Sequence, residues 1–197
     1  MYDYTRVDPG NCIEPYSDAT KIANLKQEEG FRPTAYLDAK NNLTVGYGSN
    51  LEHGLHDDIL KELGYDPQAV KDGTQAVTEE DAAKMLTEDA EQAVQESESL
   101  VNNYDNLDPD AKGVLAEMVY QMGRTKVGGF VKMRAALERA DYDEAADEML
   151  DSKWHKNPPD KGGTPERARR KAREMRAAKE DVDDCPSEQE VFGGGKG

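Results

Sequence analysis

An amphipathic pattern that runs from residue 82 to residue 101 constrains the fold of this chain more than any other feature. Apolar or small side chains recur there at helical spacing: Ala82, Met85, Leu86, Ala90, Ala93, Val94, Ser97, Leu100 and Val101. Thr78 and Asp81 precede this stripe and resemble a capping box with Asp in its final position. The pattern predicts one long helix, which must bury a single face against the rest of the domain.

Residues 34–50 carry the pattern of a small β-sheet. Four residues of types that favour strands lie in this segment: Tyr36, Leu43, Val45 and Tyr47. Residues 39–42 favour a turn, so we expect a hairpin or a three-stranded sheet. A short helix is predicted before the sheet, over residues 19–29, and another after it, over residues 57–63.

The rest of the chain is predicted to be helical. Helices are expected from Asp108-Pro109 to a break at Gly128-Gly129, from near Phe130, over residues 142–150, and from Thr164-Pro165 to about residue 179. The predicted fold class is α+β, with a small β-hairpin lobe joined by a long helix to a helical lobe. We expect an irregular leader over residues 1–18, one folded domain over residues 19–180 and a flexible tail over residues 181–197.

Charge and hydropathy limit the partners that suit this chain. The formal net charge of −16 argues against general binding to nucleic acid. Residues 153–179 depart from this average, with ten basic and three acidic residues. No run of 18 apolar residues is present, so neither a transmembrane helix nor stable membrane insertion is expected. The first residues lack the basic and then apolar order of a secretory signal, so no signal peptide is expected.

The cysteines and histidines give weak signals. Cys12 and Cys185 are either two unpaired thiols or one bridge between the ends of the chain. His53 and His56, close to two aspartates, are either part of a solvated loop or a weak metal site, and we favour the loop. No metal and no cofactor is expected.

Glu29 is the first candidate for chemistry. It falls at the end of a predicted helix, on the same face as Ile22 and Leu25, and Gly30 follows as a stop. Partial burial and the negative end of the helix dipole both disfavour a charged carboxylate there. A general acid needs such a neutral carboxyl, although Glu28 is an equal candidate on this reasoning alone.

Asp38 and Thr44 can complete a catalytic set. Asp38 falls where the predicted strand enters its turn, and Thr44 falls on the opposing strand. A hairpin can bring both side chains to the same end of a cleft. A carboxylic acid, an ionised carboxylate and a hydroxyl that holds water form the minimal set for hydrolysis of a glycoside by water.

These residues lie in motifs that resemble the active-site segment of the phage-type lysozymes and endolysins. The motifs are Gln27-Glu28-Glu29-Gly30-Phe31-Arg32, Tyr36-Leu37-Asp38 and Leu43-Thr44-Val45-Gly46-Tyr47-Gly48. Met118-Val119-Tyr120-Gln121-Met122-Gly123, with Gly128-Gly129-Phe130 after it, resembles the helical-lobe segment of that family. A third block runs from Ser152-Lys153-Trp154 to Thr164-Pro165-Glu166-Arg167-Ala168-Arg169-Arg170. The three blocks extend roughly over residues 20–178.

The resemblance implies a two-lobed lysozyme-like fold with the substrate groove between the lobes. It implies a muramidase that cuts the β-1,4 bond between N-acetylmuramic acid and N-acetylglucosamine in peptidoglycan, without a cofactor and as a monomer. Glu29 is then the acid, Asp38 the base or charge stabiliser, and Thr44 the residue that positions water. Gln121, Phe130 and Arg167 match substrate-binding positions; Arg167 is also expected near Glu29, and ordinary core packing is favoured for Phe130.

Departures from the family pattern and rival functions leave alternatives open. Ser49 stands where the family often has His, which weakens a structural pairing, and residues 51–75 look longer than in compact members. The basic helix over residues 164–179 is either a solvated face or a surface for the carboxylates of stem peptides. The rivals are a lytic transglycosylase and a wall-binding module without turnover. The protein is expected in the host cytoplasm until a holin releases it, or packaged in a virion to help deliver the genome.

Overall fold

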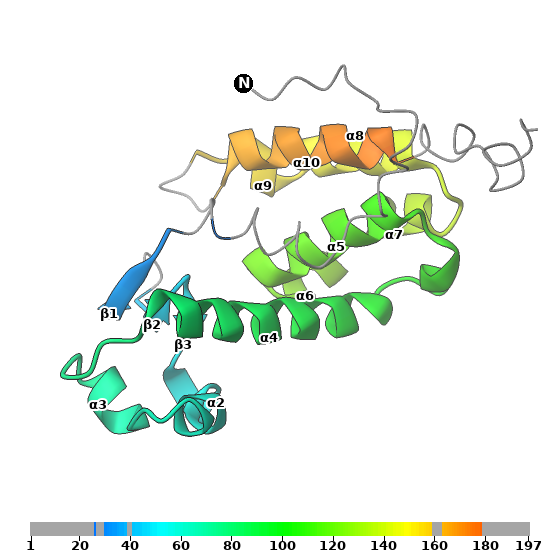
Figure 1. Cartoon of the computed structure of the whole chain (residues 1–197). Helices are drawn as coiled ribbons and strands as arrows, with labels where there is room; N and C mark the ends of the chain where they lie inside the picture. Colours follow the sequence, from blue (N-terminus) through cyan, green and yellow to red (C-terminus); the bar gives the residue numbers. More distant parts are fainter. Residues whose placement is uncertain (1–25, 27–29, 39–40, 159–162, 179–197) are drawn as a thin grey trace, which may run out of the picture. The chain divides into compact units, whose positions relative to one another are not determined.

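The computed structural model describes residues 26, 30–38, 41–158 and 163–178. The chain divides into two compact units (Figure 1). The strand-containing unit takes in the described residues up to Ser97 together with Ala116–Arg124. The helical unit takes in Glu98–Leu115 and the described residues from Thr125 onward. An α+β fold with a small sheet and a mainly helical remainder is therefore confirmed.

Three short antiparallel strands form the sheet, in the order β1-β2-β3. They are β1 (Arg32–Leu37), β2 (Leu43–Gly46) and β3 (Ser49–Asn50). Tyr36 pairs with Thr44, and the register shifts between Arg32 and Tyr36, so β1 contains an irregularity. Of the two predicted alternatives, the structure therefore has the three-stranded sheet, and its middle strand carries Thr44.

The long helix predicted from the apolar stripe is α4 (Glu79–Glu98), shown in green in Figure 1. Its buried residues lie on the predicted face: Ala82, Met85, Leu86, Ala93 and Ser97. Together with Val45 and Tyr47 of the sheet segment, this face forms the core of the strand-containing unit. The helix ends at Glu98, so Leu100 and Val101 lie beyond it, although both are buried.

The start of α4 confirms the capping box. The Asp81 backbone N–H donates to the Thr78 hydroxyl at 3.1 Å, and this hydroxyl donates to the Asp81 carboxylate at 2.7 Å. Hydrogen bonds from Thr78, Lys84 and Tyr65 lower the pKa of Asp81 from 3.8 to about 2. An ionised aspartate is therefore held at the positive end of the helix dipole.

Residues 51–75 contain more helix than the sequence predicts. A 3-10 turn η1 (Glu52–Gly54) leads into α2 (Asp57–Glu62), which matches the predicted helix, and α3 (Pro67–Lys71) follows. The sequence analysis missed α3, although Asp66-Pro67 is a helix-start signal. The Asp66 side chain accepts the Gln68 backbone N–H at 2.9 Å and so caps α3.

Within the described residues, seven helical elements follow α4. They are η2 (Tyr104–Asn106), α5 (Pro109–Met122), α6 (Arg124–Gly128), α7 (Val131–Leu137), α8 (Tyr142–Asp151), α9 (Lys153–Lys156) and α10 (Pro165–Ala177). In the helical unit, α8 packs against both α7 and α10 (Figure 1). Fully buried side chains fill this layer: Met133, Leu137, Met149 and Met175. No described helix is long and apolar enough to cross a membrane.

The helix that begins at Pro109 ends earlier than predicted. The expected break was Gly128-Gly129, but α5 stops at Met122 and a separate helix, α6, begins at Arg124. Gly123 causes this break because its φ of 83° is left-handed, and its N–H donates to the Val119 carbonyl at 2.7 Å. A glycine just past the last turn is the usual way to end a helix, and this signal was overlooked.

Gly46 provides a test of how closely the sheet approaches α4. Its φ is 67°, and an added Cβ atom would lie 2.8 Å from the Cβ of Ala82. We expect Gly46→Ala to lower the free energy of unfolding by about 2–4 kcal/mol, from left-handed strain and overpacking together. Urea denaturation of the purified protein measures this loss.

Gly73→Ala is the matched control for this prediction. Gly73 has a φ of 71°, but nothing lies within 4 Å of its added Cβ, so only the backbone strain applies. We expect this variant to lose about 1 kcal/mol. Equal losses in the two variants would contradict a close approach of Gly46 to Ala82.

Candidate active site

Glu29, the predicted acid, lies outside the described residues, as does the rest of the predicted helix over residues 19–29 apart from Lys26. Lys26 is helical, and the Gly30 backbone N–H donates to its carbonyl at 3.3 Å. Gly30 has a φ of 69°, the conformation that commonly follows the last turn of a helix. The predicted stop at Gly30 is therefore seen, and the role of Glu29 stays a prediction.

Asp38 closes the turn between β1 and β2 through Asn42. Its backbone N–H donates to the Asn42 carbonyl at 2.9 Å, so the hydrogen-bond ladder continues one step beyond β1. One carboxylate oxygen of Asp38 accepts the Asn42 backbone N–H at 2.8 Å, and the other accepts the Asn42 side-chain amide at 3.0 Å. N–H donors therefore orient both oxygens, an arrangement that suits an ionised carboxylate.

Thr44 is buried in the middle strand, where its side chain is held by β1. It pairs with Tyr36 on one side and with Asn50 on the other. Its hydroxyl donates to the Tyr36 carbonyl at 3.3 Å. Because this bond uses the only hydroxyl hydrogen, the remaining lone pairs of the Thr44 oxygen can act only as acceptors.

The register places Asp38 and Thr44 on one face of the sheet. Side chains alternate along a strand, so Tyr36 and Asp38 share a face, and Thr44, directly opposite Tyr36, shares it too. Such diagonal neighbours on adjacent strands lie about 7–8 Å apart. The opposite face carries Val45, which belongs to the hydrophobic core, and Leu43, which is partly buried and packs against this core. The sheet thus separates its core face from the face with the predicted catalytic groups.

The carboxylate of Asp89 on α4 anchors β3. One of its oxygens accepts the Ser49 hydroxyl at 2.7 Å, and the other contacts Nε2 of His56 at 2.8 Å. His56 Nδ1 lies 2.6 Å from the Asn50 carbonyl, which can only accept, so Nδ1 carries a hydrogen. Ser49 was expected to weaken a structural pairing at this position. In the structure Ser49 and His56 together bind the Asp89 carboxylate.

His56 fits neither role considered for it from the sequence. It is 7% exposed, so it is not part of a solvated loop, and both ring nitrogens have protein partners. Within the described residues, no group of three or more His, Cys, Asp or Glu is arranged to hold a metal ion. Cys12 and Cys185 lie outside the described residues.

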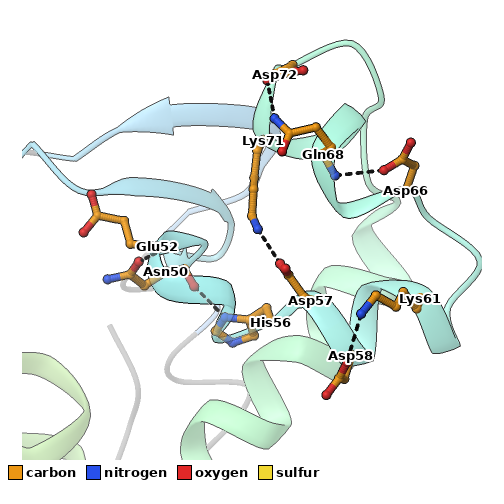
Figure 2. A network of polar contacts seen from close by, with 10 residues as sticks. All are labelled: Asn50, Glu52, His56, Asp57, Asp58, Lys61, Asp66, Gln68, Lys71 and Asp72. Atoms are coloured by element: carbon orange, nitrogen blue, oxygen red, sulfur yellow. Dashed lines mark hydrogen bonds and ion pairs between the residues drawn. The ribbon is translucent and has the colours of Figure 1, made fainter.

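Polar contacts tie the segment after β3 into one scaffold (Figure 2). Lys71 of α3 points to Asp57 of α2 and pairs with its carboxylate. Asn50 Oδ1 accepts the Glu52 backbone N–H at 2.7 Å and so connects β3 to η1. This segment is the one that looks longer than in compact members of the family, and the contacts give it a defined structure beside the sheet.

The three predicted substrate-binding residues are all half-buried. Gln121 lies on α5 in the part that belongs to the strand-containing unit. Phe130 directly precedes α7, and Arg167 lies on α10, both in the helical unit. Packing for Phe130 and contact of all three residues with substrate stay predictions.

Sequence reasoning missed Asn42 and His56 as residues that support the site. Asn42 could have been found, because Asp and Asn at the two ends of a short turn commonly bond to its backbone. His56 and Asp89 are 33 residues apart, and no local pattern connects them.

Comparison with known proteins agrees with the fold and the motifs. The phage lysozyme family matches residues 26–174 of this chain. "Probable T4-type lysozyme 2" of Dictyostelium discoideum is 29% identical over 148 residues, 68% of this chain and 84% of the relative. "Probable T4-type lysozyme 1" of the same organism is 25% identical over 150 residues, 70% of this chain and 85% of the relative.

A small antiparallel sheet with a polar carboxylate and hydroxyl face, followed by a helical remainder, defines an α+β protein of lysozyme type. The chain belongs to the phage lysozyme family. It is therefore a member of a family of glycoside hydrolases that degrade peptidoglycan, and the resemblance seen in the sequence is confirmed.

The bond between His56 and Asp89 makes the stability of this scaffold depend on pH. Burial lowers the pKa of His56, but the hydrogen bond and charge of Asp89 outweigh it, and the pKa is raised above 6.5. The Asn50 carbonyl and the charge of Glu88 act in the same direction. The stabilisation is fully present below the unfolded pKa of 6.5 and is lost as pH rises through the raised folded pKa.

We therefore expect His56→Gln to cost about 1.5–3 kcal/mol of unfolding free energy at pH 5, the range for a hydrogen bond to a charged group. The difference from the unaltered protein should shrink as the pH rises above the folded pKa of His56. Denaturation at a series of pH values measures this. His53→Asn, at an exposed neighbouring position, is the control for the loss of an imidazole and should change the unfolding free energy at pH 5 by less than about 0.5 kcal/mol. A His56→Gln difference that stays constant with pH would contradict the ion pair.

Proposed function

We propose that this chain is a muramidase that hydrolyses the β-1,4 bond between N-acetylmuramic acid and N-acetylglucosamine in peptidoglycan. Glu29 protonates the leaving oxygen, Asp38 stabilises positive charge and takes a proton from water, and Thr44 positions that water. The observation that carries the proposal is the shared sheet face of Asp38 and Thr44 within a chain of the phage lysozyme family.

The hydrogen bond of Thr44 suits the water-positioning role. Because its hydroxyl hydrogen is directed to the Tyr36 carbonyl, a water molecule at this oxygen has to donate to it. A second hydrogen of the same water can then point to the ionised Asp38. With both hydrogens used in this way, an oxygen lone pair is left to attack the anomeric carbon. This arrangement supports direct attack by water and therefore inversion at that carbon.

The biological setting has two candidates. The protein either lyses a host after a holin opens the membrane, or it travels in a virion and assists genome delivery. The two relatives described above are proteins of Dictyostelium discoideum, so neither of them points to a phage setting. Detection of the protein in purified particles by mass spectrometry supports the virion setting, and absence from them supports host lysis.

Glu29 is the central residue to test. Glu29→Gln keeps the shape but removes the acidic proton, so turnover should fall by at least about 100-fold, as general acid catalysis contributes. A turbidity assay on permeabilised bacteria measures the rate, and circular dichroism checks that the fold is intact. Glu28→Gln is the matched control and should keep substantial activity. A dead Glu28 variant beside an active Glu29 variant would reverse the assignment of the acid.

Stereochemistry tests the role of Asp38. In inverting glycosidases the two carboxyls stand roughly 6.5–9.5 Å apart, and in retaining enzymes about 5–5.5 Å, because only the former hold a water between carboxylate and sugar. We expect the β-linked substrate to release the α-anomer first. Proton NMR of the new reducing end, recorded before mutarotation, shows which anomer forms.

Two other products would change the assignment. An initial β-anomer would mean that Asp38 attacks the sugar directly. An anhydro-muramic end would identify a lytic transglycosylase, and no product at all would leave a wall-binding module.

Thr44→Val removes the hydroxyl and keeps the volume, so it should lower kcat more than it changes KM. If Thr44→Val changed KM and left kcat unaltered, Thr44 would have no role in positioning the water.

A further inference from the structure

Arg32 presents a preordered guanidinium on the first strand of the sheet. Its side chain is exposed, and its guanidinium carbon lies 4.2 Å from the centre of the Tyr36 ring. A planar guanidinium stacks favourably on an aromatic face, and the stacked group loses less freedom when it binds a ligand. Arg32 is therefore a cation whose orientation is set before any partner arrives.

Within the part of the chain that the structure describes, no carboxylate pairs with Arg32, whose contact there is the Tyr36 ring. Two other cations of the strand-containing unit have carboxylate partners. Lys61 contacts Asp58 at 3.1 Å, and Lys84 contacts Asp81 at 2.9 Å. In a chain with a net charge of −16, acidic partners are abundant, so a guanidinium without one is available to an external anion.

The position of this cation connects it with the proposed catalytic groups. Tyr36 lies directly opposite Thr44 and, by strand alternation, on the same face as Asp38. The Tyr36 carbonyl also holds the Thr44 hydroxyl. A guanidinium stacked on the Tyr36 ring therefore lies beside the groups that would act on the sugar.

We propose that Arg32, held by Tyr36, binds a carboxylate of the stem peptide that branches from the muramic acid at the cleaved bond. This inference rests on the proposed function. The glycan of an intact wall is uncharged along its backbone, and its anionic groups are the carboxylates of its stem peptides. A guanidinium offers two parallel N–H donors that match a carboxylate. Arg32 thus selects wall polymer that carries peptides over a neutral glycan.

A cycle that alters both the protein and the substrate tests this contact. The unaltered protein and Arg32→Gln are each assayed on intact peptidoglycan and on peptidoglycan whose carboxylates are converted to neutral methylamides. We expect Arg32→Gln to lower kcat/KM about fivefold on the intact wall, as for a partly exposed charged pair. On the neutral wall the same substitution should change kcat/KM by less than about twofold, because the partner is already gone.

Three variants separate the contact from general effects. Lys61→Gln removes one positive charge from the same unit and should leave both rates unchanged. Tyr36→Leu removes the ring but keeps the backbone carbonyl that Thr44 uses, so it should reproduce part of the Arg32→Gln loss on the intact wall only. Tyr36→Phe keeps the ring and should lose less of the rate on the intact wall than Tyr36→Leu does.

Each outcome of the cycle is decisive. A fivefold loss confined to the intact wall supports the contact. Equal losses on both walls, or no loss on either, would overturn it while the muramidase assignment stands. New muramic acid reducing ends must appear with the unaltered protein, and their absence on both walls would defeat the proposed function and this inference together.

Discussion

The carboxylate of Asp89 is the contact on which the geometry of the sheet depends. β3 has only two residues, and a strand of that length cannot hold its place by ladder bonds alone. Asp89 fixes it from α4 through Ser49, and the same carboxylate fixes the following turn through His56. Because β2 lies between β1 and β3, this anchor also limits how Thr44 can move. The stability of the scaffold and the orientation of the proposed water-positioning residue therefore share one partly buried, charged contact.

The features that sequence patterns predicted correctly are local ones. The capping box, the amphipathic stripe of α4 and the proline at the start of α5 each depend on residues within one or two turns of one another. The shared face of Asp38 and Thr44 was also predictable, because a two-residue alternation and a short turn leave few choices of register. The glycine break at Gly123 was equally local, so the error there came from giving more importance to Gly128-Gly129 than to a single glycine.

What the patterns could not predict depends on contacts between distant parts of the chain. The imidazole of His56 reaches a carboxylate 33 residues away, and nothing around either residue indicates this partner. The roles of Gln121, Phe130 and Arg167 differ in kind, because they came from resemblance and not from periodicity or charge. Their half-buried positions are compatible with several roles, so substrate contact for these residues stays a prediction. The role of Glu29 likewise rests on its motif, since the residue lies outside the described part of the chain.

Alternation along the hairpin explains how so small a sheet can serve both packing and chemistry. Leu43 and Val45 point into the core and fix the orientation of β2. Thr44, which lies between them, is therefore held on the opposite face. Asn42 holds Asp38 by two N–H groups, and the Tyr36 carbonyl holds the Thr44 hydroxyl, so neighbours on the hairpin orient both polar groups before substrate binds. Preorganised groups of this kind need little rearrangement when charge develops on the sugar. In the proposal above, β1 also contributes to recognition of the stem peptide, because the Arg32 guanidinium stacks on the ring of Tyr36, which lies opposite Thr44.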